Sequence, residues 1–313
     1  MKRSQWIAGT FSAAAAAALP PVVRAQSLLP VRLGFGPGDP FAQGYFALDG
    51  GFFARAGLAP DVQTFGGGGP ISEAVASGTV DIGTATTIQI ANAVTHGIPF
   101  VAIAPGCLNS RRAPSGFLIV AKNSPARTAK DLEGQTVALS QRRSITELAL
   151  ITWLRKNGAD PGQVKTIELA FDAMGPALER GTVNAAVTVE PAYTTALRAG
   201  TIRFFGDVYG AVAPQFLLSA WITTQDYARR NPEIVRRYLA AMLEVAKWAN
   251  RHRPDSGKIL AKYSKIDPEI VNAMVRAEYA ESLRAADIQA TLDIAASNGL
   301  LSKPLAAADL LAK

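Results

Sequence analysis

The chain has 313 residues, of which 49% are apolar and 18% are charged, and its formal net charge at pH 7 is +7. This composition is typical of a globular protein with a substantial core, and it excludes a disordered chain. The sequence has no stripe rich in lysine and arginine and no aromatic RNA-binding motif, so nucleic acid is not an expected partner.

The first 25 residues have the pattern of an export signal. Lys2 and Arg3 precede an alanine-rich apolar run over residues 6–19, two prolines end the run, and Val23-Arg24-Ala25 offers small residues for cleavage. We therefore expect a signal peptide at 1–25, cleaved near Ala25, and a periplasmic mature protein. Removing Lys2, Arg3 and Arg24 from the 32 basic residues leaves 29 against 25 acidic ones, a net charge of +4. The choice between the general and twin-arginine export routes stays open.

The next part of the chain alternates short apolar strands with helices. We expect strands at 31–33, 62–64 and 100–104, a short one ending at Ile82, and helices at about 41–55, after Gly69-Pro70, and up to His96-Gly97. Such alternation predicts βαβ units and a parallel-type sheet.

A second segment repeats this order. We expect strands at 136–139, 164–169 and 201–205, and helices at about 145–156, from Gly175-Pro176, and up to Ala199-Gly200. The two Gly-Thr-Val segments (78–80 and 181–183) lie 103 residues apart, as do the helix-ending glycines Gly97 and Gly200. Glycine at a helix end supplies a left-handed conformation. The repetition predicts two lobes of similar α/β fold, each a mixed sheet flanked by helices.

Two apolar runs, 115–121 and 216–223, are interpreted as extended crossovers between the lobes, with hinges near 116–121 and 217–221. Beyond them we expect a helix from Pro232 to about His252 and further helices starting at 267–269 and 286–287, all returning to pack on the first lobe. The first lobe would then comprise 26–117 plus 218–313, and the second lobe 118–217.

Ligands of open α/β sheets bind beyond the carboxyl ends of strands, where helix N-termini favour anionic or strongly polar groups. In this chain such positions carry glycines, hydroxyls and a few charges, and neither glycine loop matches a nucleotide-binding motif. The candidate ligand-binding residues are Gly36, Gly38, Asp39, Phe41, Gly67, Gly68, Thr84, Thr86, Gln141, Arg142, Arg143, Ser144 and Glu190.

The charged candidates each have two interpretations. Arg142 and Arg143 open a helix of the second lobe, where a guanidinium either holds a carboxylate, sulfonate or phosphate group or is simply solvated. Glu190 either caps a helix or accepts a hydrogen bond from a ligand amine or ring N–H.

Catalytic patterns are absent from the sequence. His96 and His252 are far apart and lack metal-ligand spacing, and Ser115 and Ser144 lack a nucleophile-elbow context. We interpret Cys107, the single cysteine, as a small semi-buried apolar residue, although a reactive thiol is conceivable. We expect no enzyme activity, no cofactor and no metal.

Three segments, 51–58, 65–68 and 76–83, together with 131–138 and the Glu-Pro segment 189–193, resemble the SsuA-type family of periplasmic solute-binding proteins. Members of this family serve ABC importers of alkanesulfonates, taurine, nitrate and thiamine-precursor pyrimidines. The resemblance implies a type II binding-protein fold that holds a ligand between its lobes, an inner-membrane permease as partner, and a monomer.

The resemblance leaves the ligand open, because Gln141-Arg142-Arg143-Ser144 stands where family members often have small residues. The arginines favour a sulfonate- or carboxylate-like solute. Stacking on Phe35, Phe41, Phe65 or Tyr193 would instead favour a neutral pyrimidine. A periplasmic enzyme or sensory partner on the same fold is the alternative class.

Overall fold

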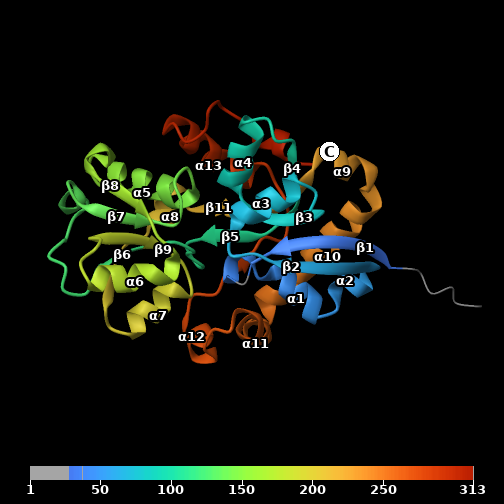
Figure 1. Cartoon of the computed structure of the whole chain (residues 1–313), viewed down its shortest axis with the longest axis horizontal. Coiled ribbons are helices and arrows are strands. Elements are labelled where there is room, and N and C mark those ends of the chain that lie inside the picture. Colours follow the sequence, from blue (N-terminus) through green and yellow to red (C-terminus); the bar gives the residue numbers. More distant parts are fainter. Residues whose placement is uncertain (1–27, 37, 313) are drawn as a thin grey trace, which may run out of the picture.

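The computed structural model of the chain describes residues 28–36 and 38–312. Two five-stranded sheets are joined by a three-stranded sheet, which gives the molecule two lobes (Figure 1). The predicted fold class, a two-lobed mixed α/β protein, is confirmed. The predicted signal peptide and its cleavage site lie outside the described residues.

The first sheet has the order β2-β1-β3-β12-β4, and the second, taken from the corresponding edge, has the order β8-β7-β9-β6-β10. The strands of the first are β1 (Leu29–Phe35), β2 (Leu58–Thr64), β3 (Ile82–Thr86), β4 (Phe100–Pro105) and β12 (Ser219–Thr224). Those of the second are β6 (Phe117–Ala121), β7 (Thr136–Leu139), β8 (Lys165–Glu168), β9 (Ala185–Thr188) and β10 (Ile202–Gly206). In each sheet one strand, β12 or β6, runs antiparallel to both neighbours.

Helices cover both faces of each sheet. In the first lobe, helix α3 (Gly68–Ala76) covers one face, and α1 (Gln43–Asp49), α2 (Phe52–Arg55) and α10 (Pro232–Arg251) lie on the other side. In the second lobe, α6 (Phe171–Glu179) and α7 (Ala192–Arg198) face α5 (Ile145–Lys156) and α8 (Val208–Val212) across the sheet. The remaining α-helices are α4 (Thr87–Thr95), α9 (Gln225–Arg230), α11 (Arg253–Ser264), α12 (Pro268–Ala273) and α13 (Ala286–Ser297), and the 3-10 helices are η1 (Asp39–Phe41), η2 (Ala129–Leu132), η3 (Pro161–Gln163) and η4 (Ala307–Leu310). None of the helices in the described part of the chain is long and apolar enough to cross a membrane.

The internal repetition is visible in the hydrogen bonds that start the central strands. The Asp81 carboxylate accepts the backbone N–H of Arg32 at 2.8 Å, and Asp81 donates its own N–H to the Arg32 carbonyl at 2.8 Å. Asn184 makes the same two contacts with Thr136, at 3.1 and 2.8 Å. The glycines paired by the sequence analysis all have positive φ: Gly78 at 74°, Gly181 at 69°, Gly97 at 91° and Gly200 at 71°. The lobes therefore share both strand order and turn geometry.

Several predicted boundaries are wrong. The helix expected over 41–55 is interrupted at Gly50 and Gly51, where Gly51 has φ of 69°. Helix α6 begins at Phe171 and contains Pro176 in its interior, at the cost of one backbone donor. The strand expected to end at Ile82 instead continues to Thr86, because β12 pairs with residues 83–86.

The crossovers also differ from those predicted. The predicted crossovers 115–121 and 216–223 lie only partly between the lobes: 117–121 forms the buried strand β6 and 219–223 lies in β12, inside the two sheets, whereas Phe216 and Leu217 do lie in the strand that joins the lobes. The strands that join the lobes are β5 (Cys107–Ser110) and β11 (Gln215–Leu217), which pair with each other. A third strand, β13 (Glu278–Tyr279), pairs with β5 and completes this hinge sheet.

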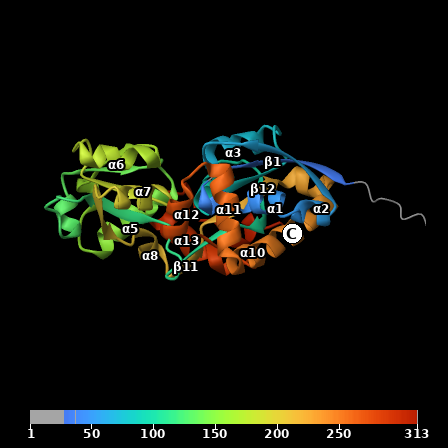
Figure 2. The same cartoon turned by 90° about the horizontal axis from the view of Figure 1, so that it is seen from below.

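The C-terminal block contacts both lobes. Helix α10 packs on α1, α2 and β4 of the first lobe, as predicted. Helix α12, in contrast, contacts α7 of the second lobe, and α13 contacts both α4 and α5 (Figure 2). The block therefore packs on the first lobe, as predicted, and α12 and α13 add contacts with the second lobe that were not predicted.

Candidate functional site

The N-termini of three helices meet where the lobes face each other. The glycine run 66–69 leads into α3, Thr86 caps α4, and the loop 140–144 leads into α5 of the second lobe. Their meeting point is Gln89, in the first turn of α4. Free N–H groups and the helix dipole make such positions favourable for anions.

Gln89 connects the three helix starts directly. Its side-chain oxygen accepts the backbone N–H and the hydroxyl of Thr86, both at 3.0 Å, which completes a capping box. Its Nε2 donates to Oε1 of Gln141 in the second lobe at 3.3 Å. A Cβ at Gly68 would lie 2.5 Å from Gln89 Oε1, so the amide end of Gln89 would have to move to make room for a side chain there. The structure thus brings together Gly68, Thr86 and Gln141, three of the predicted residues.

The backbone of the glycine run beside this point is accessible. Gly66 and Gly67 have no atom within 4 Å of an added Cβ, among the described residues. Gly67 has φ of 177°, an extended conformation open to any residue, so its backbone geometry does not require glycine. Gly66 and Gly67 therefore leave their backbone accessible from outside the protein. A separate surface hollow of about 730 Å³ lies between α11 and α12, outside this group.

The two neighbouring arginines point in different directions. Arg142 donates from Nη2 to the Thr166 carbonyl of β8 at 3.1 Å, and its backbone N–H binds Glu168 at 2.7 Å. Arg143 donates from Nη2 to the Leu300 carbonyl at 3.0 Å. Both guanidinium groups therefore already have partners within the protein.

The hydroxyl candidates divide into capping groups and a buried one without a partner. Ser144 caps α5 by accepting the Thr146 N–H at 3.3 Å. Thr84 is 2% exposed, and its Oγ1 has no hydrogen-bond partner among the described residues. On the second lobe, the Thr188 hydroxyl at the end of β9 is in the same state.

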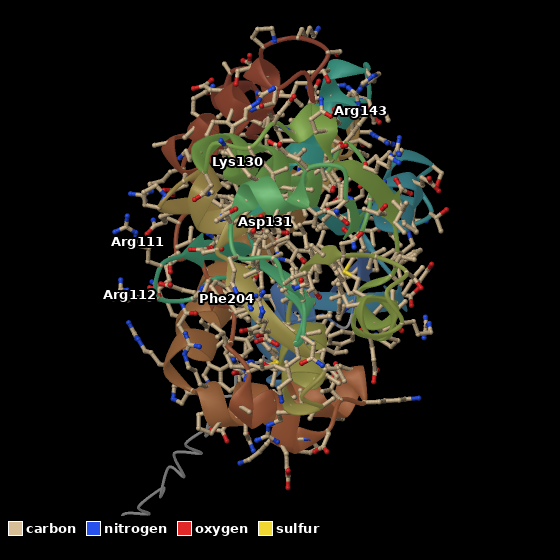
Figure 3. The ribbon with its side chains drawn as sticks, turned by 90° about the vertical axis from the view of Figure 1, so that its left-hand side faces the viewer. Arg111, Arg112, Lys130, Asp131, Arg143 and Phe204 are labelled. Atoms are coloured by element: carbon tan, nitrogen blue, oxygen red, sulfur yellow. The ribbon has the colours of Figure 1, made fainter. Side chains whose placement is uncertain are left out.

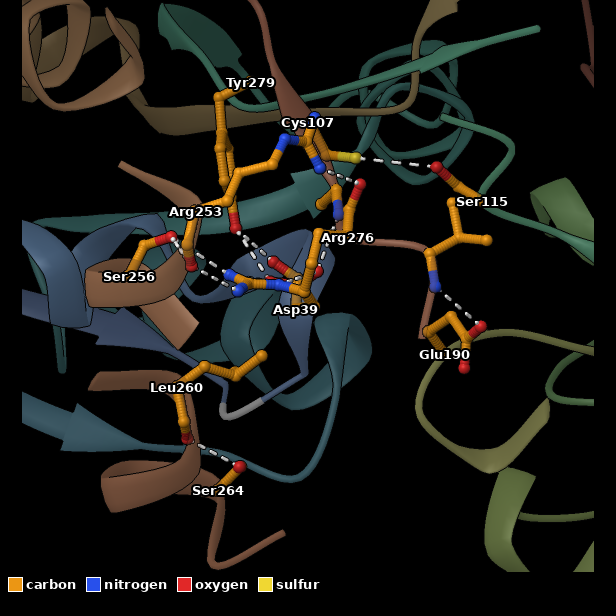
Figure 4. Close-up of polar contacts among 12 residues, drawn as sticks. Asp39, Cys107, Ser115, Glu190, Arg253, Ser256, Leu260, Ser264, Arg276 and Tyr279 are labelled. Carbon is orange, nitrogen blue, oxygen red and sulfur yellow. Dashed lines mark hydrogen bonds and ion pairs between the residues drawn. The ribbon is translucent and has the colours of Figure 1, made fainter. Parts of the chain in front are cut away.

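Glu190 is buried and caps a helix. Its carboxylate accepts the N–H and hydroxyl of Thr194 at 3.1 and 2.8 Å, which fits the capping interpretation. It also accepts the N–H of Val275 at 3.2 Å, a contact between the second lobe and the C-terminal block (Figure 4). Burial raises the pKa of Glu190 above its usual value, the bonds from Thr194 and Val275 oppose this, and the charge of Asp39 adds to it.

Asp39 has a fully occupied carboxylate. Its oxygens accept from Arg276 Nε and Nη2 at 3.1 and 3.2 Å and from the Ala277 N–H at 2.6 Å (Figure 4). Asp39 is 1% exposed and Arg276 9%, so this is a buried ion pair. Tyr279 donates its hydroxyl to the Asp39 carbonyl at 2.5 Å. These contacts tie η1 to the segment before β13.

The other predicted residues of this loop lie beside Asp39. Phe41 donates its N–H to the Gly38 carbonyl at 2.8 Å and is half-buried. Gly36 is buried, and a Cβ there would come within 3.0 Å of the Phe65 carbonyl oxygen. Asp39 and Glu190 accept hydrogen bonds from the backbone of the segment 275–277, on the α12 side of the hinge. They form a second group, separate from the group around Gln89.

Cys107 lies on β5 in the hinge sheet and is fully buried. Burial raises its pKa to about 12, slightly opposed by the Ser115 hydroxyl, whose oxygen is 3.8 Å from Sγ. The thiol is therefore protonated at neutral pH, and a protonated thiol is a poor nucleophile. Groups of histidine, cysteine and acidic residues that could hold a metal ion do not occur in residues 28–36 and 38–312.

Four residues that contact the candidates were not among them: Gln89, Val275, Arg276, and Asn92, whose Nδ2 donates to the Arg143 carbonyl. The spacing Thr86-x-x-Gln89 is a capping-box pattern that pointed to Gln89. Arg276 had no such signal, because its partner lies 237 positions away in the sequence. Val275 donates its backbone N–H to Glu190, so the identity of its side chain gives no sequence signal for this contact.

The chain has two lobes joined by a hinge sheet, and helix N-termini face each other across the junction. This is the arrangement of two-lobed ligand-binding proteins. Residues 40–256 match the model of the family described as "NMT1/THI5 like", and the chain belongs to this family. In sequence it is similar to the taurine-binding periplasmic protein of Escherichia coli K12, with 28% identity over 63% of this chain and 59% of the relative. A putative aliphatic sulfonates-binding protein of the same organism is 28% identical over 63% of this chain and 60% of the relative. The chain thus spans about three fifths of the length of these relatives.

Solved structures with the same fold cover nearly the whole chain. The periplasmic aliphatic sulphonate binding protein SsuA from E. coli superimposes with a TM-score of 0.75, at 22% identity, over 91% of this chain and 92% of that one. The alkanesulfonate-binding protein SsuA from Xanthomonas axonopodis pv. citri, bound to MOPS, gives 0.76 at 20% identity, over 90% and 98%. The desulfurization enzyme DSZB gives 0.68 at 17% identity, over 91% and 96%. The fold is therefore shared by binding proteins and at least one enzyme.

Proposed function

We propose that this chain is the solute-binding component of an ABC importer, which captures a small polar or anionic organic solute between its lobes and delivers it to a permease. One observation carries the proposal: the helix starts of α3, α4 and α5, from both lobes, converge at Gln89, next to the accessible backbone of Gly66 and Gly67. Such a junction suits a sulfonate or carboxylate group. The names of the relatives, taurine-binding and aliphatic sulfonates-binding, agree with this chemistry.

The structure changes which groups we propose to meet the ligand. Arg142, Arg143, Asp39 and Glu190 are all engaged in bonds within the protein. We therefore propose that backbone N–H groups of the glycine run and the amide of Gln141 bind the polar end of the solute. A monomeric, exported protein that works with an inner-membrane permease completes the proposal.

The test is thermal unfolding of the mature protein with a panel of taurine, aliphatic sulfonates, carboxylates, nitrate and pyrimidines. A ligand at about 100 times its Kd adds about 2.7 kcal/mol of stability. A selective rise with sulfonates or carboxylates supports the proposal. A rise with pyrimidines alone would replace the anionic solute by a neutral ring, and no rise with any of them would contradict a receptor for these classes.

An enzyme on the same fold is the second candidate, because DSZB shares it. The buried Cys107, with a pKa raised to about 12, argues against a thiol nucleophile here. We expect Cys107→Ser to keep the ligand affinity of the parent protein, measured by calorimetry. Turnover of a sulfinate or sulfonate that disappears in Cys107→Ser would show that the protein is an enzyme.

A further inference from the structure

Arg142 and Arg143 are adjacent, yet only Arg143 reaches across the junction of the lobes. Its Nη2 donates to the Leu300 carbonyl at 3.0 Å, and its own carbonyl accepts from Nδ2 of Asn92 at 2.9 Å. Asn92 belongs to α4 of the first lobe, and Leu300 follows α13, which packs on α4. Figure 3 labels Arg143 in a view from the second-lobe end of the molecule. Arg142, in contrast, contacts only Thr166 and Glu168 of its own lobe.

Arg143 also has an unfavourable backbone conformation. Its φ is 52°, and Lys265 is the only other non-glycine residue with positive φ in the described part of the chain. In this region Cβ crowds the backbone, so side-chain-bearing residues hold the conformation only when the surroundings fix it. The surroundings are the Glu147 carboxylate, which accepts the Arg143 N–H at 2.6 Å, and the two partners across the junction.

A second contact of the same loop strengthens this attachment. Gln141 accepts from Gln89 at 3.3 Å. Gln89 and Asn92 are three positions apart on α4, so they lie on the same side of that helix. The loop 141–143 therefore touches one side of α4 at two points and the C-terminal segment at a third.

We propose that the loop Gln141–Arg143 is a clasp that holds the lobes together through Gln89, Asn92 and Leu300, with Arg143 as its positioning residue. When the lobes separate, Arg143 loses two of its three fixing partners and its backbone relaxes to negative φ. The backbone strain at Arg143 is therefore present only when the lobes are together. It offsets part of the favourable free energy of the contacts between the lobes, so closure stays reversible. The effect on ligand affinity rests on the proposed function, but the clasp itself is a property of the protein without ligand.

The test measures the distance between the lobes. Spin labels at Asp61→Cys and Glu179→Cys, two exposed sites on opposite lobes, leave the buried Cys107 unlabelled. Pulsed electron resonance then gives the populations of short and long distances, without ligand and with millimolar taurine.

The variants differ in which part of the clasp they remove. Arg143→Ala loses the bond to Leu300 and keeps the strain, so the ratio of short to long distances should fall about tenfold. Arg143→Gly loses the same bond but adopts positive φ freely, so its ratio should fall clearly less. Asn92→Ala should shift the ratio in the same direction as Arg143→Ala, by about threefold. Arg142→Ala is the matched control and should leave the ratio unchanged.

Two results would overturn the clasp. One is equal ratios in Arg142→Ala, Arg143→Ala and the parent protein. The other is a loss of taurine affinity in Arg143→Ala with unchanged distances in the ligand-free protein, which would make Arg143 a ligand contact. Failure of the proposed function looks different: taurine and the other solutes would not bind, while Arg143→Ala would still widen the ligand-free distances.

Discussion

Replacing Asp39 by asparagine tests whether the buried ion pair holds the C-terminal block in place. Asparagine has nearly the same shape but no charge, so it leaves the Arg276 guanidinium, only 9% exposed, without a counterion. Removing one partner of a buried pair costs about 3–5 kcal/mol.

The assay is urea unfolding followed by circular dichroism, with thermal unfolding as a second measurement. At about 2 °C per kcal/mol for a large domain, Asp39→Asn should lower Tm by roughly 6–10 °C. The double variant Asp39→Leu, Arg276→Met should recover part of the loss, because it removes both charges from the interior. Asp226→Asn, which breaks an exposed pair with Arg230, is the control and should change stability by less than about 1 kcal/mol.

Two outcomes would refute this reasoning. A loss below about 1 kcal/mol in Asp39→Asn would mean that Arg276 finds water or another partner. A double variant less stable than Asp39→Asn would mean that packing, and not charge, makes the pair important.

Two further predictions concern the junction of the lobes. Burial raises the pKa of Glu190 above 4.5, so the folded protein binds this proton more tightly than the unfolded chain does. The resulting stabilisation of the folded protein is fully present below pH 4.5 and is lost as pH rises through the raised pKa. Glu190→Gln should flatten the dependence of unfolding free energy on pH in that window, whereas the exposed control Glu179→Gln should not; identical slopes for both variants would contradict the burial argument. Gly68→Ala places a Cβ 2.5 Å from Gln89 Oε1 and should lower stability by about 0.5–2 kcal/mol through the α4 cap, while Gly67→Ala has free space and should be neutral. Equal midpoints of thermal unfolding for the two alanine variants would show that Gln89 does not depend on Gly68.

Local patterns in the sequence predicted much of the fold. The helix α5 was expected at 145–156 and lies at Ile145–Lys156, because a serine cap and an apolar periodicity are both local signals. The repeat at an offset of 103 residues correctly indicated two lobes. The hinge was located only in part, because an apolar run does not show which strands it will pair with: Leu217 lies in the hinge sheet, but pairing placed 117–121 and 219–224 inside the two large sheets.

The charged residues of the candidate site show the limit of sequence reasoning more clearly. Arg142 and Arg143 have identical side chains in the same loop, and only φ of 52° at Arg143 turns the second one toward the first lobe. That angle depends on Asn92 and Leu300, which lie 51 and 157 positions away. No local pattern contains such information, so the two arginines could not be distinguished from sequence.

The late return of β12 to the first sheet has a consequence for folding order. The second sheet is built from one continuous stretch, 117–206, whereas the first sheet lacks β12 until residue 224 has been made. Since β12 lies between β3 and β4, its absence leaves both with unpaired backbone groups along one edge, a surface prone to association. Because the chain is synthesised from the N-terminus, the lobe that comes second in the sequence can complete its sheet first. The lobe that emerges first must remain incomplete until the chain returns to it.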